Sequence, residues 1–125
     1  MNRDNGKTKG FTLIEVAAAL IILAIGVLGI AAMQVTSTRG NYFSSQVTQA
    51  TVFGQDKLEY LRNLSYKHPD LGSGVHNEGI LPGTVFSRQY QIAEDSGNSM
   101  KTITVMVQWT DQGDHTLSFS TIRSK

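Results

Sequence analysis

The feature that most constrains the fold of this chain is an apolar run between Phe11 and Met33. Its only charged residue is Glu15, and the next charge along the sequence is Arg39. As a helix the run would measure roughly 34 Å, which is enough to cross the hydrocarbon core of a bilayer. A carboxylate inside such a run is costly at the bilayer centre, so the position of Glu15 requires an explanation.

A short basic segment precedes the apolar run. It contains Arg3, Lys7 and Lys9 against one acidic residue, Asp4. By the positive-inside rule, this excess of positive charge predicts a cytoplasmic N-terminus. Everything after Met33 is then expected outside the cytoplasm.

A cleaved secretory signal is the alternative interpretation of the same run. Small residues that a signal peptidase could use occur at 17–19 (Ala-Ala-Ala) and at 29–31 (Gly-Ile-Ala). However, the apolar region of a secretory signal is usually about 7–15 residues long, and this run is longer. The length therefore favours a permanent membrane span.

Glu15 has a local explanation and an intermolecular one. Thr12-Leu13-Ile14-Glu15 fits the capping-box pattern, in which a carboxylate in the first turn suits the positive end of the helix dipole. The capping box leaves Gly10-Phe11 unexplained. A cut after Gly10 would create an ammonium group at Phe11, four residues before Glu15. The two opposite charges could then neutralise each other, within one helix or between neighbouring copies.

The stretch Gly10-Phe11-Thr12-Leu13-Ile14-Glu15-Val16 resembles the class III signal of type IV pilins and type II secretion pseudopilins. The resemblance implies that a prepilin peptidase cuts between Gly10 and Phe11 on the cytoplasmic side and N-methylates Phe11. It also implies that Glu15, the fifth residue of the mature chain, pairs with the N-terminal amine of an adjacent subunit during assembly.

Residues 24–34 indicate which members of that family the chain resembles most. They are similar to the "GLLGLAALQ" stretch of PilV-like minor pilins, the type IV pilus modification proteins. Major pilins usually carry a proline at the position of Ala32 and a C-terminal disulfide, whereas this chain has alanine there and no cysteine. The resemblance implies a minor pilin that takes part in initiation and assembly of a type IV pilus, near its tip. Two alternatives stay open: an I-type minor pseudopilin of a type II secretion system, and a membrane-anchored periplasmic binding domain that never polymerises.

The same resemblance implies partners and a location. The partners are the prepilin peptidase, other minor pilins and the major pilin, the inner-membrane assembly machinery, and membrane lipid before assembly. The location is the bacterial inner membrane, with a single pass and a cytoplasmic N-terminus, and then the periplasm or the cell exterior in the pilus. The net charge of +1 gives no reason to expect binding to nucleic acid.

The predicted fold class is α+β, with a long N-terminal helix packed on a small antiparallel sheet of about three strands. Residues 1–10 form the leader, 11–38 the transmembrane half of the helix, and 39–125 an extracytoplasmic headgroup. Within the headgroup we expect an amphipathic helical half at 39–65, a loop at 66–83 and the sheet at 84–123. The amphipathic half carries an apolar-to-small stripe at helical spacing: Phe43, Val47, Ala50, Gly54, Leu58, Leu61 and Ser65.

The register of the last two strands can be predicted from their apolar rows. The expected strands are Thr84–Ile92, Lys101–Trp109 and His115–Ile122. A three-residue loop at 111–113, with Gly113 in the left-handed conformation, would pair Val107 with Leu117. The same register pairs Val105 with Phe119. Both apolar rows then lie on one face of the sheet, which is expected to pack on the helix stripe between Val47 and Leu61.

No arrangement of side chains in the sequence predicts a catalytic site. There is no Ser-His-Asp set and no phosphate-binding loop, so we expect no enzyme activity and no cofactor. Three histidines, in loops or at a strand start, lack metal-ligand spacing and are expected to be exposed: His68, His76 and His115. Two aspartates are expected to shape a turn: Asp111 and Asp114. Four charged residues on the helix are expected to pair on its surface: Asp56, Lys57, Glu59 and Arg62.

Overall fold

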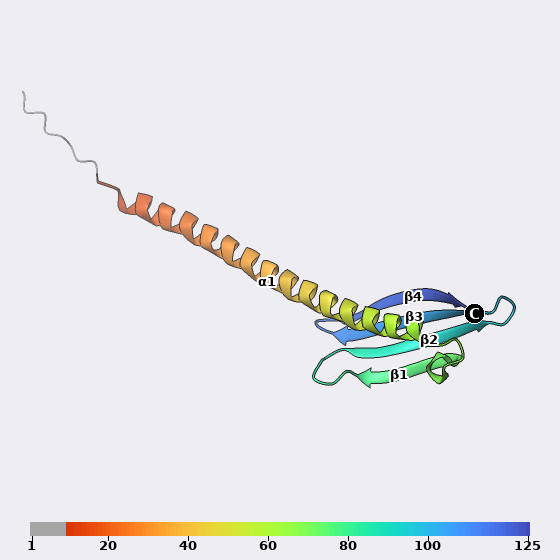
Figure 1. The fold of residues 1–125 in the computed structure, drawn as a ribbon. Coiled ribbons are helices and arrows are strands. Elements are labelled where there is room, and N and C mark those ends of the chain that lie inside the picture. Colours follow the sequence, from red (N-terminus) through yellow and green to blue (C-terminus); the bar gives the residue numbers. More distant parts are fainter. Residues whose placement is uncertain (1–9) are drawn as a thin grey trace, which may run out of the picture. The chain divides into compact units, whose positions relative to one another are not determined.

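A computed structural model of the chain describes residues 10–125, which form one long helix followed by one antiparallel sheet (Figure 1). Helix α1 spans Leu13–Asn63 and runs without interruption through Gly40. It begins two residues after the predicted start at Phe11 and ends two residues before the predicted end near Ser65. The chain divides between Tyr42 and Phe43 into two compact units.

The first unit consists of α1 up to Tyr42, and every described residue in it is exposed. Two threonine hydroxyl groups near its end donate hydrogen bonds to backbone carbonyls of the same helix. Thr36 Oγ1 donates to Ala32 O at 3.1 Å, and Thr38 Oγ1 donates to Gln34 O at 2.9 Å. Such bonds to the carbonyl four residues earlier let polar side chains occupy a helix without a water partner.

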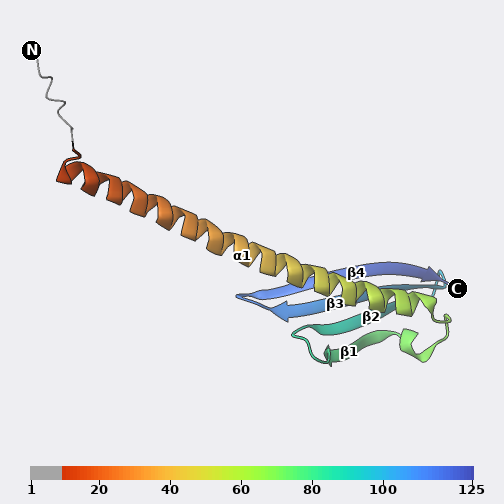
Figure 2. The same cartoon turned by 60° about the vertical axis from the view of Figure 1, so that its left-hand side comes forward.

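The second unit contains residues 43–63 of α1 and a sheet in the order β1-β2-β3-β4, with neighbouring strands antiparallel (Figure 2). A short 3₁₀ helix, η1 (Pro69–Leu71), precedes the sheet. The strands are β1 (Gly74–Ile80), β2 (Ser87–Asp95), β3 (Met100–Thr110) and β4 (Asp114–Ser124). The α+β class is thus confirmed, with four strands in place of about three.

Strand β1 lies in the segment predicted to be a loop, so that prediction was wrong. Its pattern is hard to recognise because Gly74 and Gly79 have positive φ angles of 127° and 70°. A bulge between Asn77 and Gly79 also shifts its pairing with β2. Glycine and a bulge both break the alternation on which strand prediction depends.

The β3–β4 register agrees with the sequence prediction. Val107 lies opposite Leu117, and Val105 lies opposite Phe119. The loop has three residues as expected, but the left-handed residue is Gln112, with a φ of 48°, and not Gly113. The prediction therefore had the correct loop length and pairing and the wrong left-handed position.

The core of the second unit lies between the sheet and α1, in two neighbouring clusters. One joins Leu61 of α1 to Leu71, Tyr90, Ile92, Ile103 and Val105. The other joins Ala50 of α1 to Phe86, Val107 and Trp109. The predicted packing of Val105 and Val107 on the helix stripe is confirmed, and both side chains are fully buried.

Candidate functional site

The residues predicted to be processed lie just before α1. Gly10, Phe11 and Thr12 are outside the helix, and all three are exposed. The Phe11 side chain retains 81% of its accessible surface. A β-carbon built on Gly10 would meet nothing within 4 Å, so packing within the chain does not require glycine there. The Gly10–Phe11 peptide bond is therefore accessible to another protein.

Thr12 caps the start of α1, as the capping-box pattern predicted. Its Oγ1 accepts a hydrogen bond from the backbone N–H of Glu15 at 3.2 Å. This bond satisfies one of the N–H groups that the first turn of a helix leaves without a partner. Glu15 itself lies in that first turn and is exposed. The side chain of Thr12 thus sets the helix start and leaves the Glu15 carboxylate available to another molecule.

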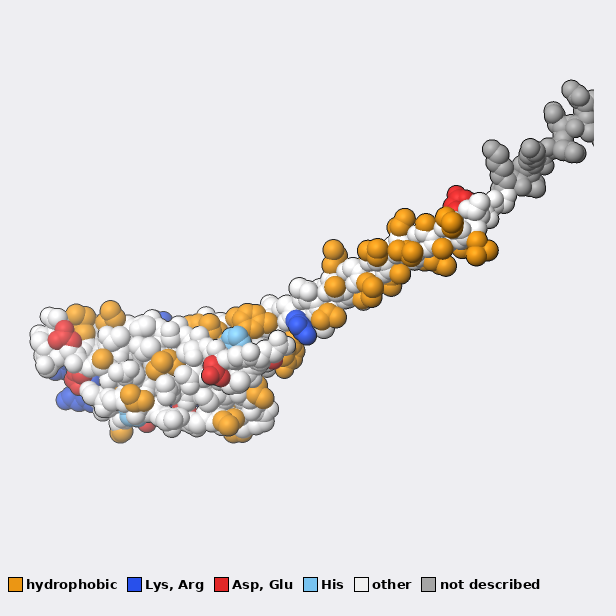
Figure 3. Space-filling view, turned by 180° about the vertical axis from the view of Figure 1, so that it is seen from behind, with side chains coloured by type: hydrophobic (Ala, Val, Ile, Leu, Met, Phe, Trp, Pro, Cys, Tyr) orange, Lys and Arg blue, Asp and Glu red, His pale blue; other side chains and the backbone are white. Residues whose placement is uncertain are grey.

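The helix after Glu15 presents an uncovered apolar surface. Figure 3 shows apolar side chains gathered along the first unit, and the large ones between Leu13 and Val35 are 47–92% exposed. A β-carbon built on Gly26 or Gly29 would also meet no other atom within 4 Å. The helix is long and apolar enough to cross a membrane. An apolar surface this extensive requires lipid or another protein to cover it.

Comparison with known families supports this interpretation of the N-terminus. A sequence model of the prokaryotic N-terminal methylation motif matches residues 5–31. The chain carries a prepilin-type signal. No curated protein and no solved structure matches the chain in the corresponding comparisons.

The matched motif spans Gly10, Phe11 and Glu15, and the roles of these three residues stay predictions. It implies processing by a prepilin peptidase and assembly with pilus or pseudopilus components. Together with the apolar helix it indicates a membrane-anchored protein. The basic residues of the leader, Arg3, Lys7 and Lys9, lie outside the described residues.

In the headgroup, the carboxylate of Glu78, in the bulge of β1, forms ion pairs with two cationic side chains. Lys57 Nζ lies 2.6 Å from Glu78 Oε1, and Arg88 Nε donates to Glu78 Oε2. Arg88 also donates through Nη1 to the carbonyl of Phe53 at 3.0 Å, which ties β2 to α1. Burial alone would raise the pKa of Glu78, but the hydrogen bonds and charges of Lys57 and Arg88 outweigh it and lower the pKa.

This cluster corrects the predicted pairing on the helix surface. Lys57 was expected to pair with neighbours on α1, yet its ion pair is with Glu78 of β1. Its ammonium group also lies 4.9 Å from the ring centroid of Tyr60 and 5.0 Å from that of Tyr90. This contact could not be predicted, because β1 itself was not recognised in the sequence.

The three histidines occupy separate structural positions. His68 Nδ1 accepts from Asp70 N and caps η1. His76 was expected in a loop, but it lies on β1 and stacks on Tyr90 at 4.6 Å. His115 lies on β4, with ring centroids of Phe43 at 5.1 Å and Trp109 at 5.2 Å. Among residues 10–125 no three or more histidines and carboxylates are grouped so that they could hold a metal ion.

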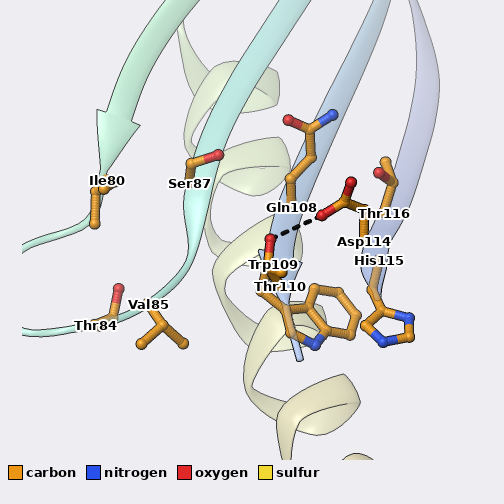
Figure 4. A pocket seen from close by; sticks show the side chains of 10 residues that line it. All are labelled: Ile80, Thr84, Val85, Ser87, Gln108, Trp109, Thr110, Asp114, His115 and Thr116. Carbon is orange, nitrogen blue, oxygen red and sulfur yellow. Dashed lines mark hydrogen bonds between the residues drawn. The ribbon is translucent and has the colours of Figure 1, made fainter. Parts of the chain in front are cut away.

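An open hollow of about 770 Å³ lies at the end of the sheet where β3 turns into β4 (Figure 4). Asp114 is the acidic residue in its lining, and its Oδ1 accepts from Thr110 Oγ1 at 2.9 Å. The ring of His115, also in the lining, bonds through Nε2 to the carbonyl of Asp111. Asp114 is exposed, and the predicted role of Asp111 and Asp114 in shaping the turn fits these contacts. The two titratable groups of the hollow are thus already engaged, and they do not form a nucleophile–base pair.

Proposed function

We propose that the chain is a PilV-like minor pilin that takes part in initiating and assembling a type IV pilus and that enters the filament near its tip. The supporting observation is the methylation motif over residues 5–31, followed by an accessible Gly10–Phe11 bond and an uncovered apolar helix. Ala32 in place of proline and the absence of cysteine favour a minor pilin over a major one. The protein acts by assembly and not by catalysis.

In this proposal the chain first spans the inner membrane once, with residues 1–10 in the cytoplasm. A prepilin peptidase removes those residues and methylates the new N-terminus at Phe11. The assembly machinery then moves the helix from lipid into a filament, where the major pilin and other minor pilins replace lipid on its apolar surface. The headgroup passes to the periplasm or the cell exterior.

The processing step is tested by intact-mass and N-terminal analysis of protein extracted from membranes. The expected product begins with N-methylated Phe11. A mature N-terminus near Ala31 would indicate a secretory signal, and an intact Met1 would indicate an unprocessed anchor. Either result contradicts the proposal.

The role in a pilus is tested by deleting the gene in its own host. Loss of surface pili with normal protein export supports the minor pilin. Normal piliation with loss of type II export supports the pseudopilin alternative. Full-length chain that is absent from sheared filaments and from export complexes supports the non-polymerising binding domain.

A further inference from the structure

The sheet has two edges, and they differ in how far they are protected against pairing with another strand. Strand β1 is short and is interrupted by the bulge between Asn77 and Gly79. Bulges and short edge strands are common devices that prevent edge-to-edge association. Strand β4 has neither device: it pairs with β3 in continuous register along all 11 of its residues.

The composition of β4 also leaves its edge open. Between Asp114 and Arg123 it contains no aspartate, glutamate, lysine or arginine, no proline and no glycine. Lysine, proline and inward-pointing charge are the usual means of blocking an exposed edge. Asp114 and Arg123 stand near the two ends of the strand, with Arg123 on the half-buried inner row, so the stretch without these devices is residues 115–122, which is long enough to be a template for strand addition.

The inner row of β4 is incompletely buried on the open side. Val105 and Val107 of β3 are fully buried, whereas their partners Phe119 and Leu117 on β4 are only half-buried. On the outer face near the same edge, Ile122 retains 67% of its accessible surface. A further strand beside β4 would cover the exposed flanks of Leu117 and Phe119 and extend the core.

We infer that β4 is an interaction edge that accepts an extended strand, antiparallel to it, from a different pilin-like subunit in the same assembly. This inference rests on the proposed function for the identity of the partner. The matching strand is uncharged over the length of the contact and carries apolar residues at alternate positions, on the face that meets Leu117 and Phe119.

The geometry argues against a second copy of this chain as the partner. Phe43, where α1 enters the headgroup, contacts His115 at the start of β4. Antiparallel pairing of two β4 strands places the two strand starts, and therefore the two entry points, at opposite ends of the contact, roughly 30 Å apart. Gly54 of α1 meets Phe119 further along β4, so residues 43–63 of α1 run along β4 and would point in opposite directions in such a pair. Pairing of β4 with β1 of a second copy would require an edge that the bulge interrupts.

Site-directed photocrosslinking tests the inference in cells that contain the full chain and its pilin-like neighbours. The sequence has no cysteine, so Ser118→Cys provides a single site on β4 for a thiol-reactive benzophenone. The matched control is Gln91→Cys on β2, which is also exposed on the outer face. Because β2 lies two strands further in, its label is about 14 Å from the added strand.

The expected result is a discrete adduct from Ser118→Cys, at least about fivefold stronger than from Gln91→Cys, since contact falls off with strand distance. Mass spectrometry should place the link in an extended segment of another subunit with a methylation motif. No adduct from Ser118→Cys, equal adducts from both positions, or an adduct to a second copy of the chain overturns the inference.

A charge variant tests the same contact without relying on label placement. Thr121→Lys adds a charge to the half-buried inner row of β4, and Thr102→Lys adds one to the outer face of β3. We expect Thr121→Lys to lower the Ser118→Cys adduct about tenfold, because the added strand would bury an unpaired charge. Thr102→Lys should leave it unchanged, and an equal effect of both variants overturns the inference. N-terminal analysis of the same samples separates the two hypotheses: an intact Met1 with a normal adduct contradicts only the proposed function.

Discussion

Phe119 of β4 lies against Gly54 of α1 so closely that a β-carbon on Gly54 would overlap the Phe119 ring. Gly54 is itself buried within the helix. Glycine in a helix interior costs about 1 kcal/mol relative to alanine, so its presence here indicates that close approach of the ring is worth more than helix propensity. This contact fixes how near β4 can come to α1.

The first prediction follows from that contact. Gly54→Ala should gain about 1 kcal/mol in helix propensity and lose about 1–3 kcal/mol by forcing the Phe119 ring away, for a net loss of stability. The measurement is thermal or urea unfolding of the full-length chain in detergent. Gly40→Ala is the control, because a β-carbon there meets nothing within 4 Å. A Gly54→Ala variant as stable as Gly40→Ala would show that the ring moves aside without cost.

The second prediction concerns the pH dependence of headgroup stability. The folded-state pKa of Glu78 is lowered from its ordinary value of 4.5, so its stabilising contribution is complete above that pH. The contribution is lost as the pH falls through the lower, folded-state pKa. Because solvent screens this partly exposed ion pair, Glu78→Gln should cost only about 1 kcal/mol at neutral pH and should weaken the acid-induced decrease in stability.

Unfolding measured between neutral pH and pH 3 checks the Glu78 prediction. Glu59→Gln is the matched control, since Glu59 is exposed on α1. If Glu78→Gln keeps the full acid-induced decrease, another carboxyl group is responsible for it.

The third prediction concerns Lys101, which has only 6% of its surface exposed. Its Nζ donates to the carbonyls of Tyr66 and Leu71 at 2.9 and 3.0 Å, and so holds the segment after α1 against β3. Lys101→Met keeps a similar volume but leaves both carbonyls without their charged donor. We expect a loss of about 2–3 kcal/mol and faster amide hydrogen exchange in residues 66–72.

Hydrogen exchange followed by mass spectrometry measures that effect. Lys67→Met, which alters an exposed lysine in the same segment, should leave exchange unchanged. Equal exchange in both variants would mean that η1 and its flanks hold their conformation without Lys101.

The parts of the fold that were predictable from sequence depend on short-range periodicity. The alternating rows of β3 and β4 determine one register, because any one-residue slip would expose Val107 or Leu117. The helix pattern likewise predicted burial of Ala50 and Leu61. These signals are contained within a few turns or one hairpin.

The parts that were missed depend on contacts between distant segments. Nothing near Glu78 in the sequence indicates that Lys57 and Arg88 will meet it, since the three residues lie on different elements. Strand β1 was missed because its glycines and bulge hide the alternation. Gln112 took the left-handed position although Gly113 is adjacent, which turn propensity alone does not predict. The methylation motif, in contrast, could be recognised in the sequence because its residues are contiguous.

The last prediction concerns Glu15, for which the structure allows two roles to be separated. Thr12 Oγ1 accepts a hydrogen bond from the backbone N–H of Glu15. The start of the helix therefore does not depend on the charge of the Glu15 carboxylate. If Glu15 only supports its own helix, Glu15→Gln should be nearly neutral, because glutamine also serves in a capping box. If the charge pairs with the ammonium group of Phe11 on a neighbouring subunit, Glu15→Gln should leave a carbonyl that cannot neutralise that ammonium in apolar surroundings. We expect the second outcome: normal processing and membrane insertion, with incorporation into filaments reduced at least about tenfold for a lost pair of this kind.

Thr12→Ala is the matched control, since it removes the cap and keeps the charge, and it should reduce incorporation far less. The measurement is the amount of each variant in sheared filaments relative to the membrane fraction. Incorporation of Glu15→Gln at the level of the unmodified chain would leave only the capping role.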